Sequence, residues 1–242
     1  IKIVAVGFDD SQKIIGGGYT YLDFVRAGGN SGTKITFKSS QAPTKIELYP
    51  SLSSISTIDT GSSESEIQLV DFGFGISRNS VGVGFLIKNA ETNSVIESTR
   101  FIVSAYDAEG FVIDVESGYI DVIFPDQVIA GSAKLTIPSG KILDHIDVQL
   151  LPGNSEPVPA SGYPFSVENV SYFEGGYSPK ATGIIKNSLT KDFDTIKVIA
   201  IAFDANEKII GSGYTYVDFV PANGQSAVEI TMTVTGTPAR VE

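Results

Sequence analysis

The segment Lys2–Ser31, KIVAVGFDDSQKIIGGGYTYLDFVRAGGNS, is matched without a gap by Lys197–Ser226, KVIAIAFDANEKIIGSGYTYVDFVPANGQS, with 18 identities in 30 positions. A more diverged version, FIVSAYDAEGFVIDVESGYID, occupies Phe101–Asp121. The unit therefore recurs at a spacing of about 97 residues, which predicts an array built from one kind of small domain. The segment Lys2–Ser31 belongs to what we call copy one, Phe101–Asp121 to copy two and Lys197–Ser226 to copy three.

Short strands joined by turns are the pattern inside each copy. Apolar and polar residues alternate, as in half-buried strands. The polar tetrapeptides Asp9–Gln12, Asp107–Gly110 and Asp204–Glu207 read as turns, because short polar side chains can satisfy turn backbone. Glycines in the strand after the turn, Gly16–Gly18 and Gly211–Gly213, indicate a bulge or a sharp bend. Helical periodicity is missing, so we predict an all-β chain of tandem immunoglobulin-like antiparallel β-sandwich repeats.

The domain limits follow from the repeats. We expect residues 1–50 to form the C-terminal part of one repeat, 66–152 a complete repeat, and 165–242 a third repeat cut in its last strand. Turn formers fill Ser51–Ser65 and Pro152–Pro164, which read as linkers, flexible in the first case and stiffer in the second. We therefore expect separate cores arranged end to end.

Alternation also predicts which residues are buried. In copy three one side of a strand carries Ile199, Ile201 and Phe203, and the other carries Val198, Ala200 and Ala202. The expected core of the complete repeat comprises Phe85, Ile87, Ile102, Tyr106, Ile120, Leu135, Ile137, Ile146 and Val148.

Copy one has no counterpart of Phe165–Thr195. We expect either further residues at one or both ends of the chain, or a neighbouring molecule that supplies strands and so causes self-association. The residues expected to face the missing half are Val4, Val6, Phe8, Leu22, Phe24, Ile35, Phe37, Ile46 and Leu48.

Composition excludes several classes of function. The formal net charge of −11 argues against nucleic acid, whose phosphates need clustered Lys and Arg. No run of about 18 apolar residues is present, so no transmembrane segment is predicted. The absence of Cys excludes disulfides, thiol catalysis and thiolate metal sites. Abundant Ser, Thr, Gly and Tyr fit an extracellular or cell-envelope protein.

Several motifs resemble a known family. Gly183–Asn187, Ala202–Gly211, Tyr216–Asp218 and Pro221–Ala227 are similar to the FxLYD-type domains of bacterial and archaeal extracellular proteins, which are small immunoglobulin-like β-sandwiches found as repeats. The resemblance covers copies two and three almost whole and the C-terminal half of copy one. It implies a fold and supplies no catalytic residues. Copy two departs from the pattern, with Asp114–Glu116 in place of the glycines.

No catalytic or cofactor site is predicted. His145 is the only histidine, no G-x-S-x-G nucleophile motif accompanies it, and alternation places it on the exposed face of a strand. The acidic turns could offer oxygen ligands to calcium, but each has only two carboxylates and their turn-forming role already explains them. We therefore predict no metal site, with calcium at these turns as the alternative.

Tyrosine pairs are the candidate ligand platform. Tyr19 and Tyr21, and likewise Tyr214 and Tyr216, lie two residues apart and so share a sheet face with Asp23 or Asp218. Such pairs can bind sugar rings or form a protein hot spot. The recurring members, Tyr21, Tyr119 and Tyr216, are expected to be architectural, which leaves Tyr19 and Tyr214 for function. The leading hypothesis is a non-catalytic spacer and protein-interaction module, and the competing one is a carbohydrate-binding module.

Overall fold

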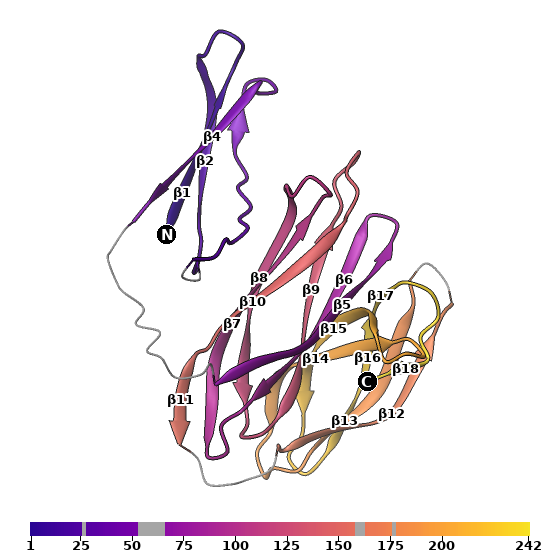
Figure 1. Cartoon of the computed structure of the whole chain (residues 1–242). Coiled ribbons are helices and arrows are strands. Elements are labelled where there is room, and N and C mark those ends of the chain that lie inside the picture. Colours follow the sequence, from indigo (N-terminus) through magenta and orange to yellow (C-terminus); the bar gives the residue numbers. More distant parts are fainter. Residues whose placement is uncertain (26–27, 53–65, 158–162, 176–177) are drawn as a thin grey trace. The chain divides into compact units, whose positions relative to one another are not determined.

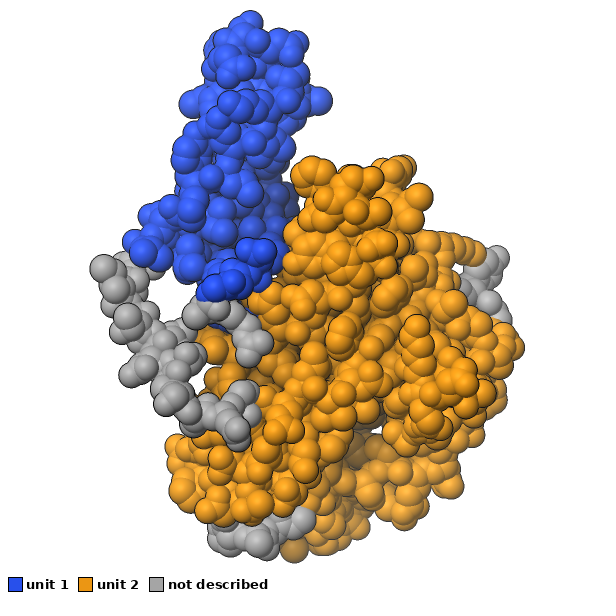
Figure 2. Space-filling view, in the orientation of Figure 1, with its two compact units in different colours: residues 1–63 blue, residues 64–242 orange. Residues whose placement is uncertain are grey.

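The computed structural model describes residues 1–25, 28–52, 66–157, 163–175 and 178–242. These residues form strands, turns and loops without a helix, and every strand pairing is antiparallel, so the all-β prediction is confirmed. The chain divides into two compact units, Ile1–Ser63 and Glu64–Glu242. Figure 1 labels the strands of both units, and Figure 2 colours unit 1 blue and unit 2 orange. Most of the first predicted linker, residues 53–65, lies outside the described residues.

The described residues of unit 1 form one four-stranded sheet, here called sheet A, in the order β3-β2-β1-β4. Its strands are β1 (Lys2–Phe8), β2 (Ile14–Tyr21), β3 (Lys38–Ser39) and β4 (Lys45–Ser51). Ala5 and Gly7 point to one face of β1, where Ala5 is buried and a Cβ on Gly7 would meet Phe37 and Pro43 at 3.2 Å. We call this the inner face of sheet A.

Unit 2 contains two β-sandwiches, one for each remaining copy. Copy two has sheet B, in the order β5-β6-β9, and sheet C, in which β7 pairs with β8, β10 and β11. The strands are β5 (Ile67–Ser77), β6 (Ser80–Asn89), β7 (Ser94–Tyr106), β8 (Val112–Ile123), β9 (Val128–Thr136), β10 (His145–Leu151) and β11 (Asn154–Pro157).

Copy three has sheet D, in the order β12-β13-β16, and sheet E, in the order β17-β15-β14-β18. The strands are β12 (Phe165–Phe173), β13 (Lys180–Asn187), β14 (Phe193–Phe203), β15 (Ile209–Val220), β16 (Gln225–Thr231), β17 (Thr233–Val234) and β18 (Arg240–Val241). Each sandwich encloses its own apolar cluster between its two sheets.

The core prediction for copy two is largely confirmed. The residues that lie in the buried cluster are Phe85, Ile87, Ile120, Leu135, Ile146 and Val148. Ile137 is partly buried against that cluster. Ile102 is buried, but alternation places it on the other face of β7 from Val103, which belongs to the cluster. Tyr106 is only half-buried and stacks on His145.

A buried asparagine makes the same set of hydrogen bonds in both sandwiches. Asn89 donates from Nδ2 to the carbonyl oxygens of Ser94 (2.9 Å) and Ile123 (3.1 Å). Asn187 does the same to Lys191 (2.8 Å) and Pro221 (3.0 Å). Each Oδ1 also accepts a backbone N–H two residues later. Both amides are almost fully buried, so these bonds satisfy polar groups that water cannot reach.

A bulge occurs at the predicted place in the hairpins. The ladder shifts register next to Gly16 in copy one and Gly211 in copy three. Gly211 has φ of 154°, and a Cβ there would collide with the backbone of Thr233 on β17, which explains the glycine. Copy two carries Asp114 at this position, and its carboxylate accepts the N–H of Thr136 at 2.7 Å.

The two sandwiches of unit 2 pack face to face, so the expected end-to-end arrangement is wrong for copies two and three. The central strand of sheet B, β6, is buried on both sides, because the outer face of sheet B contacts sheet E. That outer face presents Gly73, Gly75, Gly82 and Gly84, and a Cβ on any of them would collide with sheet E. The order of the stacked sheets is therefore C, B, E, D.

Side chains also join the two sandwiches. Ser132 and Ser212 share a buried hydroxyl hydrogen bond of 2.9 Å. Ile201, Phe203 and Ile209 form a buried cluster against Leu86 and Ala130 of copy two. The large residues of β14 thus face the neighbouring sandwich, whereas Ala200 and Ala202 face their own core.

Two further expectations need correction. Asn154–Pro157, predicted as linker, forms β11 and pairs with Ser94–Glu97, while residues 158–162 lie outside the described residues. The apolar residues of copy one do not share one face. Ile46 and Leu48 lie opposite Gly7 and Ala5 on the inner face, whereas alternation places the side chains of Val4, Val6 and Phe8 on the other one.

Candidate functional site

The tyrosine pairs lie on the outer faces of sheets A and E. Tyr19 and Tyr21 of β2 are 59% and 63% exposed, and Tyr214 and Tyr216 of β15 are 40% and 55% exposed. The two rings of each pair are nearly perpendicular, with centroids 5.9 Å apart in unit 1 and 6.1 Å apart in copy three. The predicted neighbours thus do come together, in the same geometry twice.

A lysine from the adjacent strand completes each pair. The Nζ of Lys2 lies 4.5 Å from the centroid of the Tyr19 ring, and the Nζ of Lys197 lies 4.6 Å from that of Tyr214. Lys2 is paired with Tyr21 in the ladder, and Lys197 with Tyr216. The ammonium groups are therefore held against the ring face by cation–π attraction.

Lys197 lies in an unusual electrostatic environment. Partial burial lowers its pKa, because the charged ammonium loses hydration. The negative charges of Asp121 and Glu116 in copy two oppose this shift and raise the pKa. The cation of this site is thus desolvated and flanked by carboxylates of the neighbouring sandwich.

Copy two keeps only part of the arrangement. Arg100 is paired with Tyr119 in the ladder, as the lysines are with Tyr21 and Tyr216, but Ser117 replaces the first tyrosine. Tyr119 is 53% exposed. The recurring tyrosine is therefore exposed in all three copies, which contradicts the expectation that it is an architectural residue.

The chemistry of the site follows from this geometry. Two perpendicular phenol rings, a lysine and a carboxylate such as the exposed Asp218 offer apolar area, hydroxyl groups and both signs of charge. They do not form a flat surface, and the lysine already occupies one ring face of the first tyrosine. Such a corner suits a shaped ligand with polar groups better than the flat face of a sugar ring.

A second set of cross-strand pairs explains the position of His145. His145 is exposed, as predicted, its Nδ1 lies 2.8 Å from Asp144, and its ring stacks on Tyr106 with centroids 4.9 Å apart. The equivalent ladder positions place Lys45 over Phe8 and Arg240 over Phe203. His145 is thus one of three side chains that cover an aromatic ring at this position. Sequence reasoning missed these pairs, because each one spans two distant strands.

The first aspartate of each acidic turn accepts hydrogen bonds from backbone N–H groups of its own turn. Oδ1 of Asp9 accepts the N–H groups of Ser11 and Lys13, both at 2.9 Å, and Asp204 accepts those of Asn206 and Lys208 at 2.8 and 3.0 Å. Asp107 accepts from Phe111 in the same way. Across the described part of the chain, no group of three or more potential metal ligands occurs.

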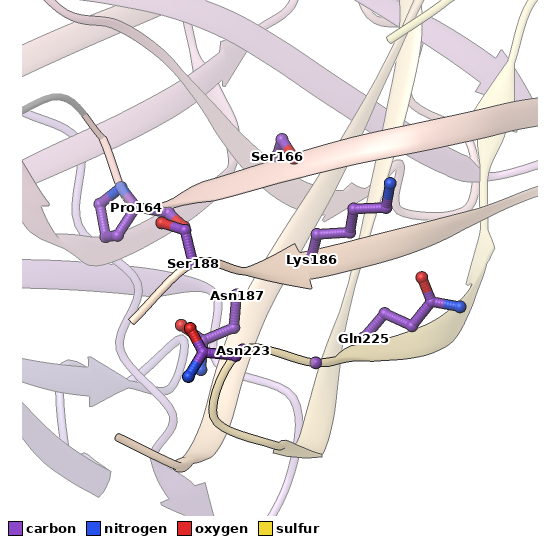
Figure 3. A pocket seen from close by; sticks show the side chains of 8 residues that line it. Pro164, Ser166, Lys186, Asn187, Ser188, Asn223 and Gln225 are labelled. Atoms are coloured by element: carbon purple, nitrogen blue, oxygen red, sulfur yellow. The ribbon is translucent and has the colours of Figure 1, made fainter. Parts of the chain in front are cut away.

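A shallow pocket of about 410 Å³ lies at one end of copy three (Figure 3). The side chains of Asn187 and Asn223 lie next to each other there. Asn187 makes three hydrogen bonds, and Ser188 donates to Pro164 at 2.9 Å. Lys186 is paired with Glu168 at 2.6 Å. Three of the polar side chains that line the pocket are therefore engaged with the protein's own groups.

Comparison with known proteins identifies no family for the chain. No family model matches the chain, and no curated protein matches it. A crystal structure of red sea bream transglutaminase is similar over 72% of this chain and 28% of that one, with 12% sequence identity and a TM-score of 0.26. The strand pairings of the chain itself define an all-β protein of stacked antiparallel sandwiches. None of the described residues forms a helix able to cross a membrane.

Proposed function

We propose that this chain is a non-catalytic extracellular or cell-envelope protein whose repeats act as spacer and protein-interaction modules. One observation carries the proposal: an exposed tyrosine faces a cation across the ladder at the same position in all three copies, as Tyr21 with Lys2, Tyr119 with Arg100 and Tyr216 with Lys197. Exposed aromatic residues on rigid strands lose little conformational freedom on binding and dominate protein hot spots.

The spacer role draws on the packing of unit 2. The glycine-lined contact between sheets B and E allows two sandwiches to lie at short distance with a buried cluster between them. Such a contact resists bending, since well-packed interfaces are not continuously deformable. The resemblance to FxLYD-type domains supports the same class and the extracellular or envelope location. The net charge of −11 favours a partner other than nucleic acid.

A carbohydrate-binding module remains the alternative. It is favoured by the high exposure of Tyr19, Tyr21, Tyr214 and Tyr216, the last two of which lie on the same face of sheet E as Ser212, beyond its contact with sheet B. The perpendicular rings and the lysine on the ring face count against flat stacking of a pyranose, which is why we place a protein partner first.

The two candidates are separated by binding assays on the full chain. Immobilised protein is tested for capture of envelope proteins and, in parallel, on a glycan array. We expect capture of a defined protein that Tyr216→Ala and Tyr21→Ala weaken and that Phe111→Ala, at an exposed aromatic residue outside the site, leaves unchanged. Saturable glycan binding lost in Tyr214→Ala would instead establish the carbohydrate-binding alternative.

A further inference from the structure

Three polar side chains in the pocket of copy three (Figure 3) are not used by the fold. The pocket has a volume of about 410 Å³, which falls in the range of about 300–1,000 Å³ for small-ligand sites. Ser166, Asn223 and Gln225 line it and are exposed. Among the described residues, the side chains of these three make no hydrogen bond or ion pair with the protein. They are therefore available to a ligand that enters the pocket.

The loop that carries Asn223 is held in one conformation. Asn223 has φ of 48°, and its own N–H donates to the carbonyl oxygen of Leu189 at 2.8 Å. The N–H of Gly224 donates to Pro221 at 3.1 Å, and its carbonyl oxygen accepts the N–H of Asn187 at 2.9 Å. A side chain on such a loop loses little freedom when a ligand binds, because the backbone position is already fixed.

Copy two contains the same loop, which allows the two corners to be compared. The N–H of Asn89 donates to the carbonyl oxygen of Gln127 at 3.0 Å, as the buried asparagine of copy three does to Gly224. Gln127 thus occupies the position of Gly224, and the residue before it, Asp126, occupies that of Asn223.

The corner of copy two is filled by long and charged side chains. Oε1 of Gln127 accepts the N–H of Phe124 at 2.8 Å. The carboxylate of Asp126 lies 3.9 Å from Nζ of Lys88. Gln68, which lies opposite Lys88 in the ladder, adds another long side chain.

Copy three has shorter and neutral side chains at these positions. Ser166 and Gly224 are smaller than the two glutamines that they replace, and Asn223 is neutral where copy two has an aspartate. Gln225 supplies an amide where copy two has a valine. The corner that copy two fills is therefore hollow in copy three and lined by amides.

The pocket carries no unbalanced charge. Among its described lining residues only Lys186 is charged, and Lys186 is paired with Glu168 at 2.6 Å. No carboxylate lines the pocket to attract a cation, and a net charge of −11 disfavours an anion. The chemistry of the pocket thus favours a neutral ligand.

We propose that this pocket binds a neutral saccharide through Ser166, Asn223 and Gln225. An amide offers both donors and an acceptor, and the hydroxyl groups of a sugar also donate and accept, so the two sets match. The ring of Pro164 and the methylene stem of Lys186 add apolar area for the C–H groups of a sugar. This inference goes beyond the proposed function, because the pocket shares no residue with the tyrosine pairs.

The test is a titration of the full chain with glucose, mannose, galactose, N-acetylglucosamine and their disaccharides, followed by NMR of the side-chain amides. We expect saturable binding of at least one of these sugars with a Kd on the order of 1 mM, since the pocket is shallow. Glucuronate, a sugar with a carboxylate, should bind more weakly than glucose. Tighter binding of a disaccharide than of its monosaccharide would assign a glycan chain as the ligand, and equal binding would assign a free sugar.

Two variants test the site itself. Asn223→Gly removes the amide side chain but accepts the positive φ, and it should weaken binding by about tenfold. Ser166→Gln inserts the side chain that copy two has at this position and should abolish binding. Asn79→Gly, at an exposed asparagine that does not line the pocket, is the matched control and should bind like the parent chain. Circular dichroism checks that each variant is folded.

The proposal would be overturned by an absence of saturable binding up to sugar concentrations on the order of 100 mM. Stronger binding of glucuronate than of glucose, or binding that both pocket variants leave unchanged, would also overturn it. Sugar binding lost in Tyr216→Ala and kept in Asn223→Gly would place the sugar at the tyrosines instead. Sugar binding without tyrosine-dependent protein capture would refute the proposed function alone, and capture without sugar binding would refute this inference alone.

Discussion

Gly82 is the residue whose substitution tests the packing of unit 2 most directly. It lies on the outer face of β6, and a Cβ there would sit 2.7 Å from the carbonyl oxygens of both Ser212 and Thr233. An ordinary contact between these atoms is longer by roughly half an ångström or more. Both obstacles are backbone atoms of sheet E, so no side-chain rotation can relieve the clash in Gly82→Ala.

The size of the destabilisation expected for Gly82→Ala follows from the displacement that the added Cβ requires. Sheet E has to shift away from sheet B, which stretches the Ser132–Ser212 hydrogen bond and loosens the contacts of Ile201 and Ile209, now 2% and 1% exposed. Overpacking of this kind costs about 1–3 kcal/mol. We therefore expect Gly82→Ala to lower the free energy of unfolding by about 2 kcal/mol and the melting temperature by about 4–8 °C.

Thermal and urea unfolding of the full chain measure this effect. Gly175→Ala is the matched control, because a Cβ at Gly175 has no neighbour within 4 Å, and it should change stability by less than about 0.5 kcal/mol. Both substitutions reduce the freedom of the unfolded chain alike, so their difference isolates the clash. Equal stabilities of the two variants would refute the close packing of sheets B and E.

Three more outcomes are expected. Asn187→Ala should cost about 2–3 kcal/mol in urea unfolding, since two carbonyls and one N–H lose a buried partner; a neutral result would contradict this role. The hydrogen bond from Lys141 lowers the pKa of Asp107. Lys141→Ala should therefore destabilise the protein near neutral pH, and this destabilisation should disappear as the pH falls below the ordinary pKa of 3.8 and through the lowered one. A pH-independent destabilisation would exclude this coupling. EDTA should leave the melting temperature unchanged, and a large fall would point to calcium at the acidic turns.

Local patterns were sufficient for the strands and turns. The Asp turns and the bulge beside Gly16 and Gly211 were predictable, because a turn or bulge depends on a few consecutive residues. The burial of most of the predicted core of copy two was also correct, since alternation reports which side chains share a face. The position of the tyrosine pairs on one sheet face followed from the same rule.

Tertiary structure decided which neighbour each face of a sheet contacts. Alternation separates Ile201 from Ala202, but it cannot tell that the alanine faces its own core and the isoleucine the next sandwich, because both environments are apolar. By sequence alone, the glycines of β5 and β6 indicate weak strand positions. The contact of sheet E with these glycines is visible only in the tertiary structure. The pairs Phe8–Lys45, Tyr106–His145 and Phe203–Arg240 depend on the register of distant strands, which no local pattern contains. Sequence alone therefore determined the strands and their repetition, and only the packing of one sheet on another determined which side chains are core, which are contact and which are free to bind.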